Sequence, residues 1–220
     1  MSSGTVCDPL VLGEAAQAPN GRDARLAFWI NAYNALVLDG LGALGIRGSV
    51  RELPDFFGRI GYRVGGLVVS ADEIEHGVLR GNRPSPLASA APFGPDDPRR
   101  AWALDPPDPR VHFAISCGAR SCPAVRRYAA DAVDDQLEAA AHAYVNREVT
   151  LENGRLTAPE VFWWFAADFV RCPGGLAGLL ARYLDEGPAR RALLERGLEG
   201  LAWRAWDWRL AESPAGGAGG

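Results

Sequence analysis

The sequence predicts an α+β fold in which several helices pack on a small, mostly antiparallel sheet with β-hairpins. One observation is an apolar segment, RLAFWINAYNALVLDG at 25–40, whose pattern predicts a long buried helix. The other is a pair of predicted hairpins, at 62–70 around Gly65-Gly66 and at 149–157 with an Asn-Gly turn. Because the strands are few and do not alternate strictly with helices, a doubly wound parallel sheet is not favoured.

The other expected elements follow the same mixed order along the chain. SADEIEHGVLR predicts a short helix that begins after Ser70, with Glu73 closing a capping box. VHFAIS at 111–116 predicts a strand, and 131–147 predicts a helix. From Pro159 to about residue 200 the pattern is helical.

Length and composition limit the classes of protein. The chain has 220 residues, and we expect a single globular domain over 1–210 followed by a disordered Gly/Ala-rich tail over 211–220. A net charge of −4 offers no positive field for nucleic acid, and the absence of lysine excludes Schiff-base and P-loop chemistry. Neither a signal-peptide pattern nor a membrane span is present, so we expect a soluble cytoplasmic protein with reduced thiols and no membrane partner.

The stretch HFAISCGARSCP at 112–123 holds two of the four cysteines. A helix beginning at Pro123 would place Cys122 at or near its N-cap, where free N–H groups lower the pKa of a thiol. Cys117 has no such helix, so Cys122 is the better candidate nucleophile. Other roles stay open: two buried structural cysteines, a zinc site with His112, or a disulfide between the two cysteines.

A nucleophilic cysteine needs an imidazole within hydrogen-bond reach. Strand alternation places His112 with Ser116 on a small polar face, as beside a cleft. A straight strand would put His112 about 16 Å from Cys117, so His112 could approach only Cys122, and only if the loop folds back. His142 lies on an alanine-rich amphipathic helix and is expected at the surface or at its boundary with the core.

Polar side chains also interrupt two predicted apolar helices. Glu75 falls within the apolar stripe of its helix and demands a partner, an imidazole or an arginine, while His76 lies at the edge of that stripe. His76 comes from a separate element and could approach either cysteine. Asn31 and Asn34 are one turn apart in the buried helix. They either tie loop backbone to the core, or orient an imidazole or donate to an oxyanion.

Several uncommon strings occur in one order along the chain: LAFWINAYNALVL, DEIEHGVLRGNRP, DPRVHFAISCGARSCP, VFWWFAADF and AWDWRL. In this pattern the chain resembles the domain of unknown function 547 family, from Arg25 to Phe169 and again from Trp206 to Leu210. The resemblance implies no settled activity. Members commonly carry Asn where this chain has Ser116. The family's characteristic residues map here onto Trp29, Asn31, Asn34, Glu75, His76, Arg80, His112, Cys117, Cys122 and Pro123.

The leading hypothesis is a thiol-dependent acyl-transfer or amide-hydrolase site, in a fold similar to papain-like or transglutaminase-like enzymes. It assigns Cys122 or Cys117 as nucleophile, His76 or His112 as base, and Glu75 to orient the imidazole. Oxyanion or substrate contacts are expected from Asn31, Asn34, Arg80 and Ser116. The substrate would be a small molecule or a peptide, and no cofactor is expected. The rivals are a non-enzymatic ligand- or protein-binding domain with a structural Cys loop, and a Cys/His metal site.

Overall fold

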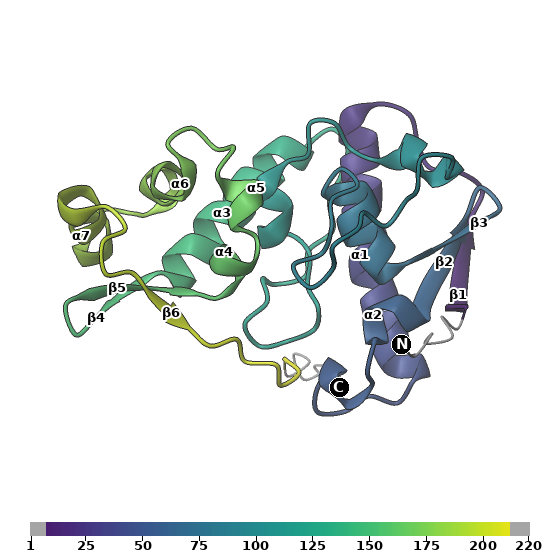
Figure 1. Ribbon diagram of the computed structural model, residues 1–220, viewed down its shortest axis with the longest axis horizontal. Helices are drawn as coiled ribbons and strands as arrows, with labels where there is room; N and C mark the ends of the chain where they lie inside the picture. The colour runs from purple at the N-terminus through teal and green to yellow at the C-terminus, as the bar shows by residue number, and fades with distance from the viewer. Residues whose placement is uncertain (1–7, 212–220) are drawn as a thin grey trace, which may run out of the picture.

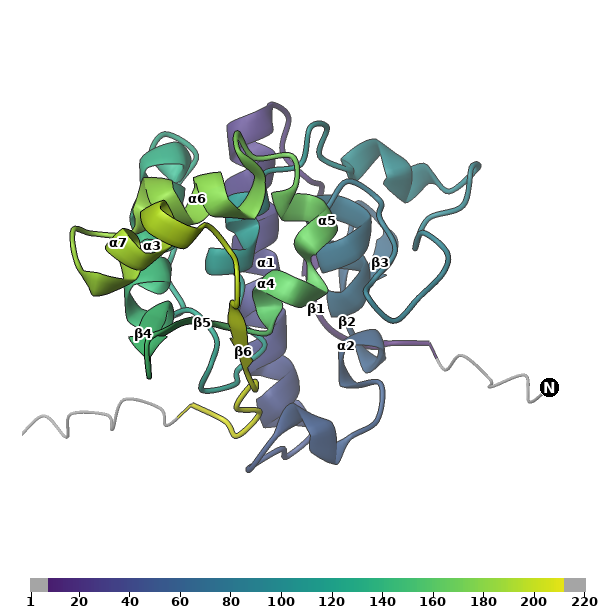
Figure 2. The ribbon, with the colours of Figure 1, turned by 60° about the vertical axis from the view of Figure 1, so that its left-hand side comes forward.

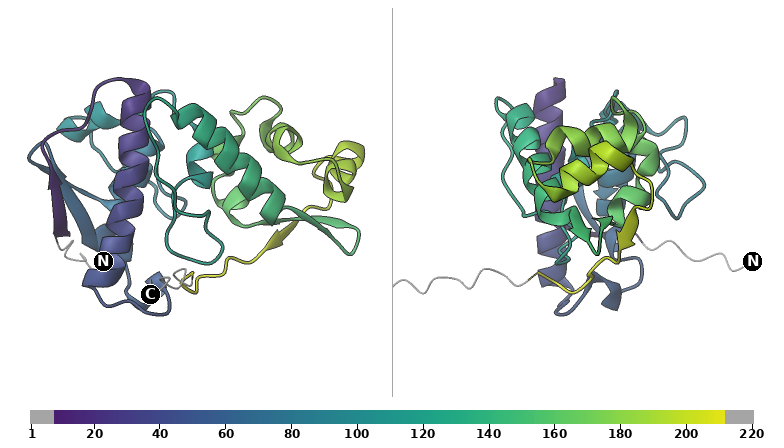
Figure 3. Two further views of the ribbon diagram at one scale, coloured as in Figure 1. Left: turned by 180° about the vertical axis from the view of Figure 1, so that it is seen from behind. Right: turned by 90° about the vertical axis from the view of Figure 1, so that its left-hand side faces the viewer.

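Two three-stranded sheets lie at opposite ends of the molecule, with helices α1 (Arg22–Ala43) and α3 (Val133–Glu148) between them (Figure 1, Figure 3). The computed structural model describes residues 8–211, so most of the predicted tail at 211–220 and the start of the predicted domain lie outside the described residues. The α+β class is confirmed, although two mixed sheets replace the one mostly antiparallel sheet that was expected. None of the helices within 8–211 combines the length and the apolar character needed to cross a membrane.

The first sheet contains the predicted hairpin and one additional strand. Strands β2 (Ile60–Val64) and β3 (Leu67–Ser70) pair antiparallel through a turn in which Gly65 and Gly66 have φ of 56° and 81°. This left-handed backbone favours glycine, which carries no Cβ. Strand β1 (Leu10–Ala15), which the sequence pattern did not predict, lies parallel to β2 and completes the order β1-β2-β3.

The predicted helix at 25–40 is α1, and it is buried along most of its length. Trp29, Ile30 and Leu36 are fully inaccessible to solvent. Gly40 lets α1 approach the first sheet closely, because a Cβ there would lie 2.7 Å from the side chain of Ile60. The helix thus carries most of the core that covers the β1-β2-β3 sheet.

Short helices fill the connections between α1 and α3. The predicted capping box is confirmed: the Ser70 N–H donates to Glu73 (2.9 Å), and the Glu73 N–H donates to the Ser70 hydroxyl (3.2 Å). The helix that follows is a π-helix. These connecting helices are η1 (Val50–Glu52), α2 (Phe56–Arg59), η2 (Glu73–Leu79), η3 (Pro98–Trp102) and η4 (Pro109–Phe113).

The predicted strand at 111–116 is wrong, because this segment begins inside the 3-10 helix η4. Asp108 caps the helix by accepting from the Arg110 N–H (3.0 Å), and Pro109 occupies its first turn. A capping side chain followed by a proline in the first turn is typical of the start of a helix, and neither feature favours a strand. All residues of 111–116 are buried, so the expected division into a core face and a polar face is also wrong.

The second sheet and the last helices complete the fold. Strands β4 (Thr150–Glu152) and β5 (Arg155–Pro159) form the predicted hairpin, and β6 (Ala202–Arg204) adds in parallel to β5. Figure 2 shows α4 and α5 in front of α1, and α6 and α7 beside α3. The predicted helical region is confirmed as α4 (Val161–Trp164), α5 (Ala166–Phe169), α6 (Gly175–Tyr183) and α7 (Pro188–Arg196).

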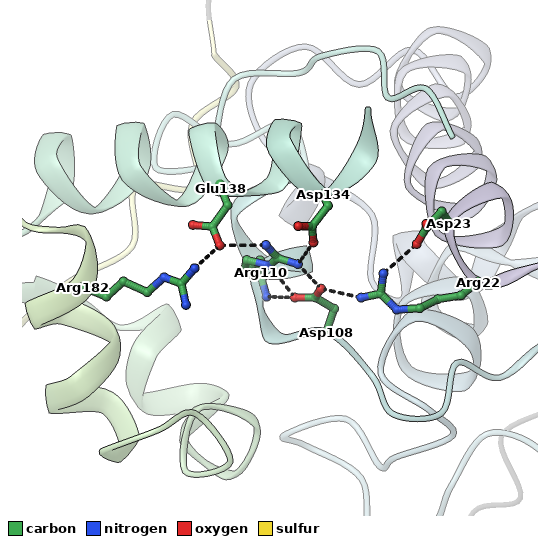
Figure 4. A network of polar contacts seen from close by, with 7 residues as sticks. All are labelled: Arg22, Asp23, Asp108, Arg110, Asp134, Glu138 and Arg182. Atoms are coloured by element: carbon green, nitrogen blue, oxygen red, sulfur yellow. Dashed lines mark hydrogen bonds and ion pairs between the residues drawn. The ribbon is translucent and has the colours of Figure 1, made fainter. Parts of the chain in front are cut away.

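A network of charged side chains connects the start of α1 with η4, α3 and α6 (Figure 4). At its centre, Arg110 binds Asp108 (2.6 Å), Asp134 (2.5 Å) and Glu138 (3.0 Å). Burial alone would raise the pKa of the Asp108 carboxyl, but its hydrogen bonds with Arg110 outweigh this effect and leave the pKa below the usual range. The network extends outward to Arg22, Asp23 and Arg182.

The apolar core consists of two clusters. The first packs around α1 and the β1-β2-β3 sheet, and the second around α3 and the β4-β5-β6 sheet. As predicted, the string VFWWFAADF supplies core residues to the second cluster, where Phe162 and Phe169 are fully buried. Trp208 packs against both clusters.

Candidate functional site

A cavity of about 400 Å³ is lined by residues of both apolar clusters, and this volume is within the range of small-molecule sites. Five of the predicted site residues line it: Glu75, His76, His112, Cys117 and Cys122. The other four do not line it: Asn31, Asn34, Arg80 and Ser116. The remaining lining residues are Tyr33, Arg51, Phe57, Asp72, Ser85, Pro86, Leu87, Ile115, Pro123, Val161, Trp164, Phe165, Trp206 and Trp208.

The structure overturns the distance argument against His112. That argument assumed an extended strand, whereas the chain turns through η4 and then through a tight loop to Cys117. A helical segment rises less per residue than a strand, so the segment is compact. His112 therefore lines the same cavity as both cysteines.

The loop that carries the cysteines is not the start of a helix. No helix begins at Pro123, and α3 begins only at Val133, so the predicted N-cap role of Cys122 is wrong. The loop is held instead by the segment that follows β6. Ser121 Oγ accepts from the Asp207 N–H (2.9 Å), and Gly118 O accepts from the Ala211 N–H (2.9 Å).

The two thiols of this loop are in direct contact. Cys117 Sγ lies 2.9 Å from Cys122 Sγ, and the Cys117 N–H donates to the same Cys122 sulfur (3.1 Å). Burial alone would raise the pKa of Cys122, but hydrogen bonds from Cys117, Ser116 and backbone N–H groups outweigh it, so this pKa lies below its usual value. The hydrogen bond to Cys122 and burial both raise the pKa of Cys117. Cys122 is therefore the thiol that ionises first.

His112 is paired with an acidic residue that the sequence analysis did not select. Its Nε2 lies 2.9 Å from Asp168 Oδ2 in α5. Burial alone would raise the pKa of Asp168, but hydrogen bonds from His112 and Arg80 outweigh it and hold this pKa well below its usual range. Because the Asp168 carboxylate is ionised and can only accept, Nε2 of His112 carries a proton, and in the neutral tautomer of the ring the lone pair is on Nδ1. None of the described residues hydrogen-bonds that Nδ1.

Arg80 organises the wall behind both imidazoles. Its Nε donates to Asp168 Oδ2 (2.6 Å), and its Nη1 lies 2.9 Å from His76 Nδ1. Arg83 adds a second ion pair to Asp168 (2.6 Å). The Phe165 ring stacks on His112 with centroids 4.1 Å apart, and the Arg80 guanidinium lies over Phe165. Asp168 and Phe165 thus fix the position of the His112 ring.

His76 has a different proton arrangement from His112. Arg80 can only donate, so Nδ1 of His76 is the acceptor and the proton of the neutral ring is on Nε2. Nε2 faces Asp72 Oδ1 at 3.5 Å. Burial lowers the pKa of His76 to about 4, with the positive charge of Arg80 acting in the same direction and Asp72 opposing it. His76 is therefore a neutral hydrogen-bond donor near pH 7.

Glu75 finds its main partner in a tyrosine of α1. Tyr33 OH donates to Glu75 Oε2 (3.1 Å), while Oε1 lies 3.9 Å from His76 Nδ1. The predicted demand for a partner is correct, but a hydroxyl provides the hydrogen bond. Burial raises the pKa of the Glu75 carboxyl.

Asn31 and Asn34 tie loop backbone to α1. Asn34 donates to Ala114 O (2.9 Å) and accepts from the Ser116 N–H (2.8 Å), which fixes the chain just before Cys117. Asn31 makes the same pair of bonds with the backbone of Tyr128, at 2.7 and 2.9 Å. This is the structural alternative that the sequence left open. Asn34 holds the chain that leads into Cys117, Asn31 holds the chain at Tyr128, and neither amide lines the cavity.

Sequence reasoning missed several residues of the site. Asp168 is an acidic residue inside the apolar string VFWWFAADF, and the argument applied to Glu75 would have singled it out as a buried charge that needs a partner. The aromatic wall of Trp164, Trp206 and Trp208 has no such signal in the sequence, because aromatic side chains are typical of any protein core. Within residues 8–211, no three His, Cys, Asp or Glu side chains are arranged to hold a metal ion.

Comparison with family models gives one match, to the protein of unknown function family DUF547, over residues 18–145 and so over more than half of the chain. The chain belongs to this family. The DUF547 match contains both cysteines, His76 and His112, whereas Asp168 and the three tryptophans of the wall lie beyond it. No curated protein and no solved structure matches the chain.

Proposed function

We propose that the cavity is the active site of a thiol-dependent enzyme, an acyltransferase or an amide hydrolase, with Cys122 as the nucleophile. The observation that carries the proposal is the surroundings of the Cys122 sulfur, which accepts a hydrogen bond from the Cys117 N–H (3.1 Å) and lies 2.9 Å from the Cys117 sulfur. Such bonds favour the thiolate, which is the reactive form of cysteine. His112 lines the same cavity and supplies the imidazole that cysteine catalysis requires.

In the proposed reaction, His112 is the acid and base. Cys122 gives its thiol proton to Nδ1 of His112 and attacks an acyl carbon. The bond from that carbon to the leaving group breaks, a thioester forms, and the leaving group takes the proton from Nδ1 of the His112 imidazolium. His112 then accepts a proton at Nδ1 from water or an acceptor amine, which attacks the thioester and releases Cys122 as thiolate. Asp168 keeps Nε2 protonated throughout and stabilises the positive ring.

His76 fits the role of a donor better than that of a base. Its Nδ1 lone pair accepts from Arg80, and its Nε2–H is the remaining polar group of the ring. A fixed N–H in a cavity of low polarity stabilises the oxyanion of an acyl-transfer intermediate. The proposal therefore assigns the base role to His112 and hydrogen-bond donation to His76.

The cavity wall indicates the kind of acyl group. Trp164, Trp206 and Trp208 form a contiguous aromatic surface, with the stacked pair Trp164 and Trp208 at 5.8 Å between ring centroids. The guanidinium of Arg51 lies over Trp208, 4.6 Å from its centroid. We propose a small-molecule or peptide substrate whose acyl part is apolar, in a reducing compartment such as the cytoplasm, where both thiols stay free.

Alkylation with iodoacetamide across a pH series tests the thiolate. We expect Cys122 to react with an apparent pKa below the ordinary value of ~8.5, whereas Cys172, whose pKa is raised by burial, reacts only at higher pH. Peptide mass spectrometry assigns each rate to its cysteine. Equal and ordinary pH profiles at the two residues would contradict the thiolate assignment.

Acyl transfer itself is tested with p-nitrophenyl acetate. The wild type should release a burst of p-nitrophenolate stoichiometric with enzyme and carry an acetyl group on Cys122. Cys122→Ser should lose the burst, and His112→Asn should slow the release of the acetyl group by about 10²-fold or more. A reactive Cys122 that is never acylated by this ester would favour the rival of a ligand-binding domain.

A further inference from the structure

We propose that Cys117 and Cys122 form a reversible redox pair, in which a hydroperoxide oxidises Cys122 and Cys117 then closes a disulfide. This inference goes beyond the proposed acyl transfer and does not depend on it. Both cysteines are free thiols in the structure. The contact between them, rather than either cysteine alone, carries the inference.

The geometry brings the two sulfurs close to bonding distance. They lie 2.9 Å apart, and a disulfide bond is about 2.05 Å long, so the sulfurs need to approach by less than about 1 Å. Gly118 lies in the turn between the two cysteines and has a φ of 84°, a left-handed backbone conformation that favours glycine. A larger residue would also be crowded, because a Cβ at this position would lie 3.1 Å from the Leu41 side chain. The turn between the cysteines is thus built to hold the two sulfurs against each other.

The turn is also fixed from outside, which keeps the sulfurs together. The Arg120 N–H donates to Arg209 O (2.8 Å), and Tyr144 OH donates to Ser121 O (3.2 Å). Arg147 donates to the carbonyl of Cys122 itself (2.9 Å). A preorganised pair loses little conformational freedom when the disulfide forms.

The protonation states of the two thiols suit the two steps. Cys122 has the lower pKa and lines the cavity, so its thiolate can attack a small hydroperoxide. The peroxide O–O bond breaks, Cys122 becomes a sulfenic acid, and the alcohol or water leaves. The Cys117 sulfur then attacks the Cys122 sulfur, the S–O bond breaks, and the departing hydroxide takes the thiol proton as water. An external dithiol restores both thiols by exchange.

The test uses the full-length protein and one equivalent of hydrogen peroxide, followed by thiol counting and peptide mass spectrometry. We expect the loss of two thiols, a mass lower by two hydrogen atoms, and a peptide that links Cys117 to Cys122. Dithiothreitol should restore the thiols. Cys172→Ser is the matched control and should oxidise in the same way as the wild type.

The Cys117→Ser variant tests whether Cys117 reacts with the oxidised Cys122 or only lies close to it. In this variant, dimedone should trap a sulfenic acid on Cys122 that the wild type does not accumulate. The inference is overturned if the wild type keeps its thiols, if Cys122 passes directly to sulfinic acid, or if it pairs with another cysteine. These readouts require no acyl substrate, so the two proposals fail separately. If the disulfide forms but p-nitrophenyl acetate gives no burst, only the proposed acyl transfer is contradicted. If the burst occurs but no disulfide forms, only the redox pair is contradicted.

Discussion

At the scale of single residues, Asp168 decides which imidazole can act as a base. It is 4% exposed, yet it accepts from His112, Arg80 and Arg83. An ionised carboxylate with so many donors fixes the His112 tautomer, whereas the donation by Arg80 fixes the opposite tautomer in His76. Two histidines on one cavity wall therefore have different chemical roles, and the difference follows from their neighbours.

Asp168→Asn should destabilise the protein strongly. The substitution leaves two buried or half-buried arginines without their carboxylate, and breaking a buried ion pair costs about 3–5 kcal/mol. Urea unfolding at pH 7 measures the loss. Asp185→Asn is the matched control, because Asp185 contacts His142 at 2.8 Å but both side chains are mostly exposed.

The control variant should change the free energy of unfolding by less than about 1 kcal/mol, since exposed pairs contribute little. The effect of Asp168→Asn should also shrink in acid. The pKa of Asp168 is lowered in the folded state. The stabilisation that its ionised carboxylate provides is therefore fully present above the unfolded pKa of about 3.9, and it is lost as the pH falls through the lower folded pKa. Equal losses in the two variants at pH 7 would contradict the role given to Asp168.

At the scale of elements, α1 shows how one helix both builds the core and positions the site. It presents Tyr33 to Glu75, and Asn34 to the chain before Cys117. Its last turns lie against β2, where Gly40 meets Ile60. The exposed side of the same turns carries Gly42, which has no neighbouring atoms within 4 Å of an added Cβ.

Gly40→Ala and Gly42→Ala should therefore change stability in opposite directions. Gly42→Ala should raise the free energy of unfolding by about 0.5–1 kcal/mol, because alanine is the better helix former. Gly40→Ala gains the same propensity but forces a Cβ to within 2.7 Å of Ile60, and overpacking typically costs about 1–3 kcal/mol. Urea midpoints of the two variants give the comparison; a stabilised Gly40→Ala would show that the packing is looser than described.

At the scale of the whole molecule, the cavity depends on both apolar clusters. Tyr33 and Ile115 of the first cluster and Cys122, Val161 and Phe165 of the second all line it. The charged network in Figure 4 and the packing of Trp208 on both clusters also connect the two halves. We therefore expect the halves to unfold as one cooperative unit, in agreement with the prediction of a single domain.

Core truncation in either cluster should shift one common transition. Leu36→Ala in the first cluster and Leu180→Ala in the second remove side chains that are fully buried, and each should lower the free energy of unfolding by about 2–5 kcal/mol. Far-UV circular dichroism and tryptophan fluorescence should report the same urea midpoint in each variant. A biphasic curve in which one substitution moves only one phase would indicate two independent units.

The sequence by itself determined those features that depend on neighbouring residues. Ser70 and Glu73 form their capping box, Gly65-Gly66 and Asn153-Gly154 form their turns, and the apolar period of α1 produces a buried helix. Each of these follows from local backbone geometry or from one helical repeat. The same reasoning identified Glu75, His76, His112 and both cysteines, because polar groups in apolar segments are unusual.

The tertiary structure alone decided how those residues work together. The segment 111–116 is apolar enough for a strand, but it has no strand partner and starts in the helix that Asp108 and Pro109 initiate. Cys122 owes its low pKa to Cys117 and Ser116 rather than to a helix, and His112 owes its tautomer to Asp168. These are contacts between groups that a tight turn or distant segments bring together, and a local pattern carries no information about the hydrogen bonds that such groups make once folded.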